Sequence, residues 1–268
     1  SVITGTGALD SITGGNGADT VNATAGTDVI NLGGGNDKFI YGEVAAVETV
    51  SGGTGSNDQI VMVAGVDIVA ATDMATYTNF DKLTVTPSAT VYSFIGHATF
   101  ASATSITELD FSGDTNATGV NVINIAAFTT TTAMNITGSA GIDQYVGDIQ
   151  TPGTIKLGAL VDTINLGTTG AAQTVIVENA TAADADVITN FITGQDFIDL
   201  SAVMLPATLT VAGSALNVQG ANTQGIGAAI ITTAANTDAI TYWIDNAASA
   251  NGVQALAQIE TAVAAGSA

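Results

Sequence analysis

The stretch Gly14-Gly15-Asn16-Gly17-Ala18-Asp19-Thr20-Val21-Asn22 carries the pattern that decides the fold of this chain. It matches the nonapeptide G-G-x-G-x-D-x-U-x, in which U is a large apolar residue, at every specified position. Asp10, Asp28 and Asp37 continue the same nine-residue spacing, and an apolar residue follows each of them by two positions. This spacing predicts a repeat in which six residues form a tight turn and three form a short strand.

The glycines of the repeat lie where a tight turn needs them. Glycine permits a positive φ, so a glycine-rich turn can direct its backbone carbonyls toward a shared point. Carbonyl and carboxylate oxygens together are the ligands that calcium prefers. We therefore predict that the turns bind calcium and that their contributing residues, besides the aspartates, are Gly14, Gly15, Asn16, Gly17, Gly26, Gly33 and Gly35.

The aspartates of the repeat are the predicted side-chain ligands. Two nine-residue halves complete one coil, so turns 18 residues apart are expected to stack on the same side. This places Asp10 opposite Asp28, and Asp19 opposite Asp37, with several calcium ions between the turns. Without calcium these carboxylates would repel one another, so folding and calcium binding should be coupled.

Weaker copies of the repeat continue along the chain. They include Gly52-Gly53-Thr54-Gly55-Ser56-Asn57-Asp58-Gln59-Ile60, Gly138-Ser139-Ala140-Gly141-Ile142-Asp143-Gln144-Tyr145 and Asp162-Thr163-Ile164-Asn165-Leu166-Gly167. We predict Asp58, Asp143 and Asp162 as further calcium ligands. The isolated Asp81-Lys82-Leu83 is interpreted as an ordinary turn leading into a strand.

The segments between the copies have the alternation of strands. Lys82 to Thr86 and Val120 to Ile125 alternate polar and apolar residues. Asn251 to Ala265 instead repeats apolar residues at three- and four-residue steps, which predicts a helix. The expected fold is all-β: a calcium-binding parallel β-roll or β-solenoid with right-handed coils and a short C-terminal helix. We expect a regular roll over 1–64, a less regular β segment continuing the solenoid over 65–134, and a second roll-like segment over 135–268.

The composition restricts the partners. The 268 residues include 24 acidic residues and only three basic ones, which gives a formal charge of −21. Three lysines cannot neutralise a nucleic-acid backbone or anchor the chain to an anionic membrane. No apolar run is long enough for membrane insertion. There is no Cys, and the sole His, His97, cannot build a zinc centre alone, so calcium or magnesium are the suitable metals.

These repeats resemble those of the repeats-in-toxin (RTX) family of bacterial type I secretion substrates. A second similarity is Asp186-Val187-Ile188-Thr189-Asn190-Phe191-Ile192-Thr193-Gly194-Gln195-Asp196-Phe197-Ile198-Asp199-Leu200-Ser201, which looks like a segment common near the C-termini of such proteins. The resemblance adds Asp196 and Asp199 as candidate metal ligands. It implies export by the type I secretion apparatus, with an uncleaved C-terminal signal, followed by folding outside the cell in calcium.

Within that family the composition is most similar to a surface-layer protein. We therefore expect a structural, non-enzymatic subunit of the bacterial cell surface, or its C-terminal portion, that self-assembles into a lattice. An N-terminal region outside this sequence is expected to contact cell-surface polysaccharide. The alternative is the C-terminal calcium-binding and secretion module of a secreted hydrolase or adhesin, and a stand-alone sugar-binding adhesin is a third reading. No H-E-x-x-H or G-x-S-x-G motif is present.

Overall fold

The structure is a computed structural model. It describes residues 1–22, 25–42, 48–70, 74–98, 100, 105–128, 132–147, 153–167, 171–176, 178, 186–190 and 196, and the backbone of 197–199, 209–210, 231–233, 236–240 and 243–245.

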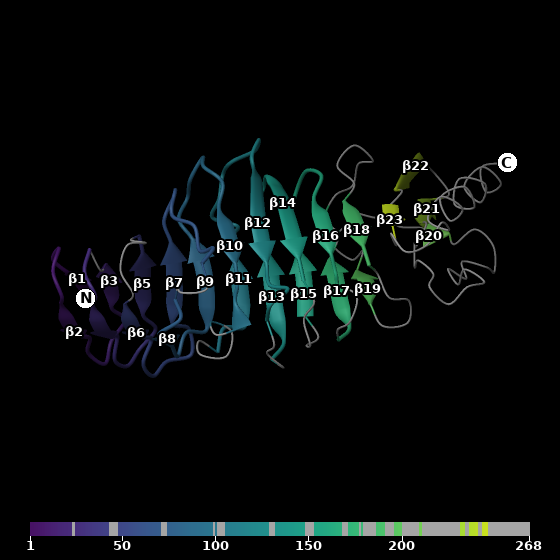
Figure 1. Ribbon diagram of the computed structural model, residues 1–268. Helices are drawn as coiled ribbons and strands as arrows, with labels where there is room; N and C mark the ends of the chain where they lie inside the picture. Colours follow the sequence, from purple (N-terminus) through teal and green to yellow (C-terminus); the bar gives the residue numbers. More distant parts are fainter. Residues whose placement is uncertain are drawn as a thin grey trace.

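The chain winds into a stack of parallel strands, a β-solenoid (Figure 1). Each circuit adds one strand to a ten-stranded sheet that runs the length of the stack. Its strands in order are β1 (Val2–Thr4), β3 (Thr20–Asn22), β5 (Lys38–Tyr41), β7 (Gln59–Met62), β9 (Lys82–Val85), β11 (Glu108–Asp110), β13 (Met134–Thr137), β15 (Gly153–Lys156), β17 (Gln173–Ile176) and β19 (Phe197–Asp199). The predicted all-β parallel solenoid is confirmed, and helix is almost absent from the described residues.

The even-numbered strands up to β18, together with β23, form two further parallel sheets in succession. The first contains β2 (Ser11–Thr13), β4 (Val29–Asn31), β6 (Thr49–Ser51) and β8 (Tyr77–Thr78). The second contains β10 (Ser93–Ile95), β12 (Val120–Asn124), β14 (Ile142–Val146), β16 (Thr163–Asn165), β18 (Val187–Thr189) and β23 (Trp243–Asp245). A separate antiparallel sheet consists of β20 (Leu209–Thr210), β21 (Ile231–Thr233) and β22 (Asn236–Ile240). The predicted C-terminal helix lies outside the described residues.

The short strands form because each places one apolar side chain inside the coil. Val21, Ile30 and Phe39 are the second residues after successive aspartates, and all three are buried. Val21 and Phe39 are register partners on neighbouring strands. Burying one such side chain contributes about 1.5–3 kcal/mol, which a single isolated three-residue strand could not obtain. The stacking of coils therefore provides both the core and the backbone partners.

The coils lengthen toward the middle of the chain. Residues in register are 18 apart at Asp19 and Asp37, 21 apart at Asp37 and Asp58, and 26 apart at Lys82 and Glu108. A longer coil encloses more space, and larger side chains fill it. Phe94 contacts Phe100 and Phe128 with ring centroids 5.6 and 6.3 Å apart. The ten-stranded sheet continues without a break past residues 64 and 135.

Candidate metal-binding turns

Aspartates line one edge of the ten-stranded sheet, directly before its strands. We call Asp19, Asp37, Asp58 and Asp81 the first corner column. The backbone N–H of Asp19 donates to Oδ1 of Asp37 at 2.8 Å, and that of Asp37 donates to Oδ1 of Asp58 at 2.9 Å. Asp58 in turn donates to Oδ2 of Asp81 at 2.8 Å. Each carboxylate therefore joins its own coil to the preceding one.

Two more corner columns use the same connection. In the second corner column, the N–H of Asp10 donates to Oδ1 of Asp28 at 2.9 Å. The third corner column borders the six-stranded sheet and consists of Asn121, Asp143, Asp162 and Asp186. There the N–H of Asp143 donates to Oδ1 of Asp162 at 2.8 Å, and that of Asp162 to Oδ1 of Asp186 at 3.1 Å.

The glycine-rich turns stack directly on one another between these columns. The N–H of Gly34 donates to the carbonyl of Gly15, and that of Thr54 to the carbonyl of Gly33, both at 2.8 Å. Gly33 has φ +99°, and a Cβ on it would lie 2.3 Å from the Gly15 oxygen. Only glycine fits such a position without displacing the neighbouring coil. Stacked turns of this kind bring backbone carbonyls close to the aspartate columns.

Three of the buried carboxylates have one oxygen without a hydrogen-bond partner. Oδ1 of Asp28, Asp37 and Asp162 accepts the N–H of the preceding coil, whereas Oδ2 of each has no partner. All three residues are 0% exposed. A buried acceptor without a donor is costly, and a buried carboxylate oxygen is more costly still. A cation bound by Oδ2 would supply the missing interaction, so these residues fit a metal ion.

The pKa shifts show that burial disfavours the ionised form of these carboxylates. Burial, followed by the neighbouring charges of Asp186 and Asp143, raises the pKa of Asp162 to about 8. Burial also raises the pKa of Asp58. In the same column, the amino group of Ser1 donates to Asp19 Oδ1 at 2.5 Å and holds the pKa of Asp19 below its usual range. A cation beside Asp162 would therefore displace a proton.

The residues predicted from the repeat occupy different places in these turns. Asp10 is half-buried, and its Oδ2 accepts the N–H of Thr6 at 2.6 Å. Asp196 is buried and accepts the N–H of Gln173 at 3.0 Å. Asp199 lies inside β19, where its backbone pairs with Ile176, and its side chain is outside the described residues. The predicted turn residues are Gly14, Gly15, Asn16, Gly17, Gly26, Gly33 and Gly35, and all precede strands of the first coils.

Asp143 differs from Asp28, Asp37 and Asp162 because both of its oxygens have hydrogen-bond donors. Oδ1 accepts the side-chain amide of Asn121 at 2.9 Å. Oδ2 accepts the backbone N–H and the hydroxyl of Ser139 at 2.7 and 3.0 Å. Burial nevertheless raises the pKa of Asp143.

Sequence reasoning omits three members of the corner columns, which are Asp81, Asn121 and Asp186. Asp81-Lys82-Leu83 and Asp186-Val187-Ile188 have the same aspartate-to-apolar spacing as Asp19-Thr20-Val21. That spacing is the signal that could have identified them. Asp58 and Asp81 are 23 residues apart, so the nine-residue register no longer marks the position.

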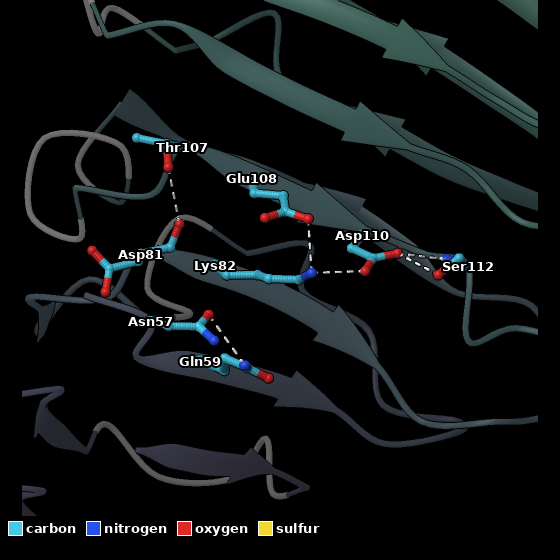
Figure 2. A network of polar contacts seen from close by, with 8 residues as sticks. All are labelled: Asn57, Gln59, Asp81, Lys82, Thr107, Glu108, Asp110 and Ser112. Carbon is cyan, nitrogen blue, oxygen red and sulfur yellow. Dashed lines mark hydrogen bonds and ion pairs between the residues drawn. The ribbon is translucent and has the colours of Figure 1, made fainter. Parts of the chain in front are cut away.

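An ion-pair network lies beside the first corner column on the outer face of the ten-stranded sheet. Figure 2 shows Lys82 of β9 reaching toward two carboxylates of β11. Its Nζ is 2.7 Å from Glu108 Oε1 and 2.8 Å from Asp110 Oδ2. The backbone carbonyl of Asp81 accepts the Thr107 hydroxyl at 3.4 Å. This network stabilises the pairing of β9 with β11, and the charge of Lys82 is paired with those of Glu108 and Asp110.

Within the described ranges, no three side chains of His, Cys, Asp and Glu gather closely enough to hold a metal by themselves. A cation at the corner columns would therefore need backbone carbonyl oxygens as well, which calcium accepts.

His97 Nε2 lies 3.2 Å from the carbonyl oxygen of Val69, so that nitrogen carries the proton. No helix in the part of the chain that the structure describes has the length and apolar character to cross a membrane.

The geometry defines a parallel β-solenoid with carboxylate-lined corners. In comparisons with known proteins, no family model, no curated protein and no solved structure matches this chain.

Proposed function

We propose that this chain is a calcium-binding structural protein of the bacterial cell surface, a surface-layer subunit or a portion of one. The observation that carries the proposal is the set of partnerless Oδ2 atoms on Asp28, Asp37 and Asp162, each fully buried beside the stacked turns. The same division of the carboxylate recurs in all three columns. Recurrence at equivalent positions is expected of a repeated binding site rather than of an accidental defect.

Calcium fits these turns better than other common metals. The available donors are carboxylate and backbone carbonyl oxygens, which favour a hard cation. Magnesium demands a more regular octahedral shell and usually retains several waters, which buried turns accommodate poorly. The chain contains no Cys and a single His, so a zinc site cannot be completed from soft ligands.

Bound calcium would supply positive charge between stacked coils. The Oδ2 atoms of Asp28, Asp37 and Asp162 and carbonyls of the glycine-rich turns would hold it. The carboxylates would then remain ionised without repelling one another, and the stacked state would gain the binding free energy. The same coupling would let the chain stay unfolded in a calcium-poor cytoplasm and fold outside, as its resemblance to type I secretion substrates implies.

The charge balance supports assembly through calcium. Lys82 pairs with Glu108 and Asp110, and Lys156 Nζ lies 2.9 Å from Glu178. Two of three lysines are thus engaged within the chain, whose formal charge is −21. Surfaces so rich in carboxylates repel one another unless cations lie between them. Calcium would therefore act both inside the solenoid and between subunits of a lattice.

A calcium titration followed by circular dichroism and light scattering tests this proposal. The chain is first stripped with chelator, and a magnesium titration serves as the control. We expect a cooperative gain of β signal with calcium alone, followed by growth of large ordered particles. Folding without growth would favour the calcium-binding module of a larger secreted protein. An unchanged spectrum with calcium would contradict the binding itself.

A further inference from the structure

The third corner column contains one turn that is completed by an amide. Asn121 of β12 is the register partner of Asp143 and is 1% exposed. Its Nδ2 donates to Oδ2 of Asp114 and to Oδ1 of Asp143, both at 2.9 Å, and lies 3.2 Å from Ser139 Oγ. The amide nitrogen therefore sits between two buried carboxylates.

The orientation of this amide is fixed by the backbone. Oδ1 of Asn121 accepts the N–H of Tyr92 at 2.8 Å. A flipped amide would place its NH₂ group against that N–H and its oxygen against the two carboxylates. Both changes would be repulsive, so Asn121 can only present donors to Asp114 and Asp143.

All four carboxylate oxygens of this turn have donors. Oδ1 of Asp114 accepts the N–H of Asn116 at 3.1 Å, and its Oδ2 accepts Asn121. Oδ2 of Asp143 accepts both donors of Ser139. Here, unlike at Asp37 and Asp162, no carboxylate oxygen is left for a cation to satisfy.

The coils around Asn121 also contain closely packed aromatic side chains. Phe94, Phe100 and Phe128 form one group, and Tyr92 meets Phe111 with centroids 6.4 Å apart. Large buried aromatic rings dominate the free energy of a core. These coils thus combine a complete hydrogen-bond network with extensive apolar burial.

We infer that the turn of Asp114, Asn121, Ser139 and Asp143 is a cation-independent joint, in which the Asn121 amide performs the role that calcium has at the other corners. The coils joined by it, described over 105–128 and 132–147, keep their structure when calcium is removed. The coils over 1–62 lose theirs. The joint then provides a folded template on which the regular roll forms when calcium is added. The contrast between these two sets of coils rests on the proposed function, whereas the joint itself does not.

Hydrogen exchange of the full chain, followed by peptide mass spectrometry in calcium and in chelator, tests the inference. We expect peptides of 105–147 to retain their protection in chelator, and peptides of 1–62 to lose it by tenfold or more. Loss of protection in both regions would overturn the joint. Retention of protection in both regions would overturn the calcium dependence of the roll, and so the proposed function, while leaving the joint in place.

Asn121→Asp gives an independent test because it replaces the donating amide with a third carboxylate. In chelator we expect peptides of 105–147 to lose protection by tenfold or more. Asn124→Asp is the matched control: it makes the same charge change on the outer face of β12, where Oδ1 only accepts the N–H of Ala126 at 3.0 Å. Equal exchange in the two variants would overturn the role of Asn121.

Discussion

Asp37 and Asp58 are connected through a single carboxylate oxygen: the N–H of Asp37 donates to Oδ1 of Asp58 at 2.9 Å. The carboxylate of Asp37 has the corresponding bond from Asp19, while its other oxygen, fully buried, has no partner. One oxygen of this carboxylate thus supports the fold, and the second is available for a ligand.

Asp37→Asn separates these two roles. The amide oxygen can still accept the N–H of Asp19, but the negative charge is lost, so we expect calcium affinity to fall tenfold or more. Stability in chelator should stay the same or rise, since a buried charge is removed. Thermal melts with and without calcium measure both effects. Asp67→Asn is the control, because this exposed aspartate accepts the N–H of Ser93 at 2.9 Å; an equal effect there would contradict the assignment.

The pKa of Asp162, about 8, predicts how the calcium-free protein responds to pH. The pKa of Asp162 in the folded chain lies above the unfolded value near 3.8. The stability that the Asp162 carboxyl contributes is therefore fully present below about pH 4. That stability is lost as the pH rises to 8. In chelator, the melting temperature should therefore fall between pH 5 and about 8. Asp162→Asn should flatten this profile, and a wild-type melting temperature that rose over the same range would refute the prediction.

Gly33→Ala tests the close stacking of the turns. The added Cβ would lie 2.3 Å from the Gly15 carbonyl oxygen, at a φ that side chains rarely adopt. We expect a loss of about 1–3 kcal/mol in the free energy of unfolding, measured in calcium. Gly17→Ala is the matched control, because a Cβ there has no neighbour within 4 Å. Similar losses in both variants would show that the stacking is looser than described.

The hydroxyl of Tyr145 is buried without a hydrogen-bond partner. Tyr145→Phe removes this oxygen, so we expect the free energy of unfolding to stay the same or rise by about 1 kcal/mol. Tyr92→Phe should instead lower it by about 1 kcal/mol, since the Tyr92 hydroxyl donates to the carbonyl of Thr86 at 2.5 Å. Denaturant unfolding distinguishes the two. A clear loss in Tyr145→Phe would mean that this hydroxyl has a partner.

Lys82 opposes two carboxylates on the neighbouring strand. Burial works against its charge, but hydrogen bonds to Asp110 and Glu108 outweigh burial and raise the pKa of Lys82. Lys82→Met leaves these acidic groups side by side, so we expect a loss of about 1 kcal/mol that shrinks in high salt. Lys38→Met, at an exposed lysine, should change little. Denaturant unfolding at two salt concentrations checks both, and salt-independent loss would point to packing instead.

The sequence predicts the regular part of the fold well because the strand and turn lengths there are constant. Asp10, Asp19, Asp28 and Asp37 keep one spacing, so their coils and their coil-to-coil connections follow directly. The strand predicted at 82–86 is confirmed as β9, Lys82–Val85. Parallel stacking then required only that successive strands bury the same face.

The less regular part could not be predicted because the coils there vary in length. Asp81 and Asp186 fall outside the nine-residue register, although each precedes a strand as Asp19 does. Asn121 alternates with apolar residues and therefore resembles an outward-facing strand residue. Its burial depends on Asp114 and Asp143, which pattern reasoning along the chain cannot bring together.

The corner columns also give the solenoid a direction. At the steps from Asp10 to Asp28, Asp19 to Asp37 and Asp143 to Asp162, the donor belongs to the earlier coil and the acceptor to the later one. A chain that folds from its C-terminal side therefore offers each arriving coil an acceptor already in place. In a chain that folds from its N-terminal side, the aspartate N–H of the newest coil has no acceptor until the next coil is added. The two ends of the solenoid are thus unequal as starting points for growth.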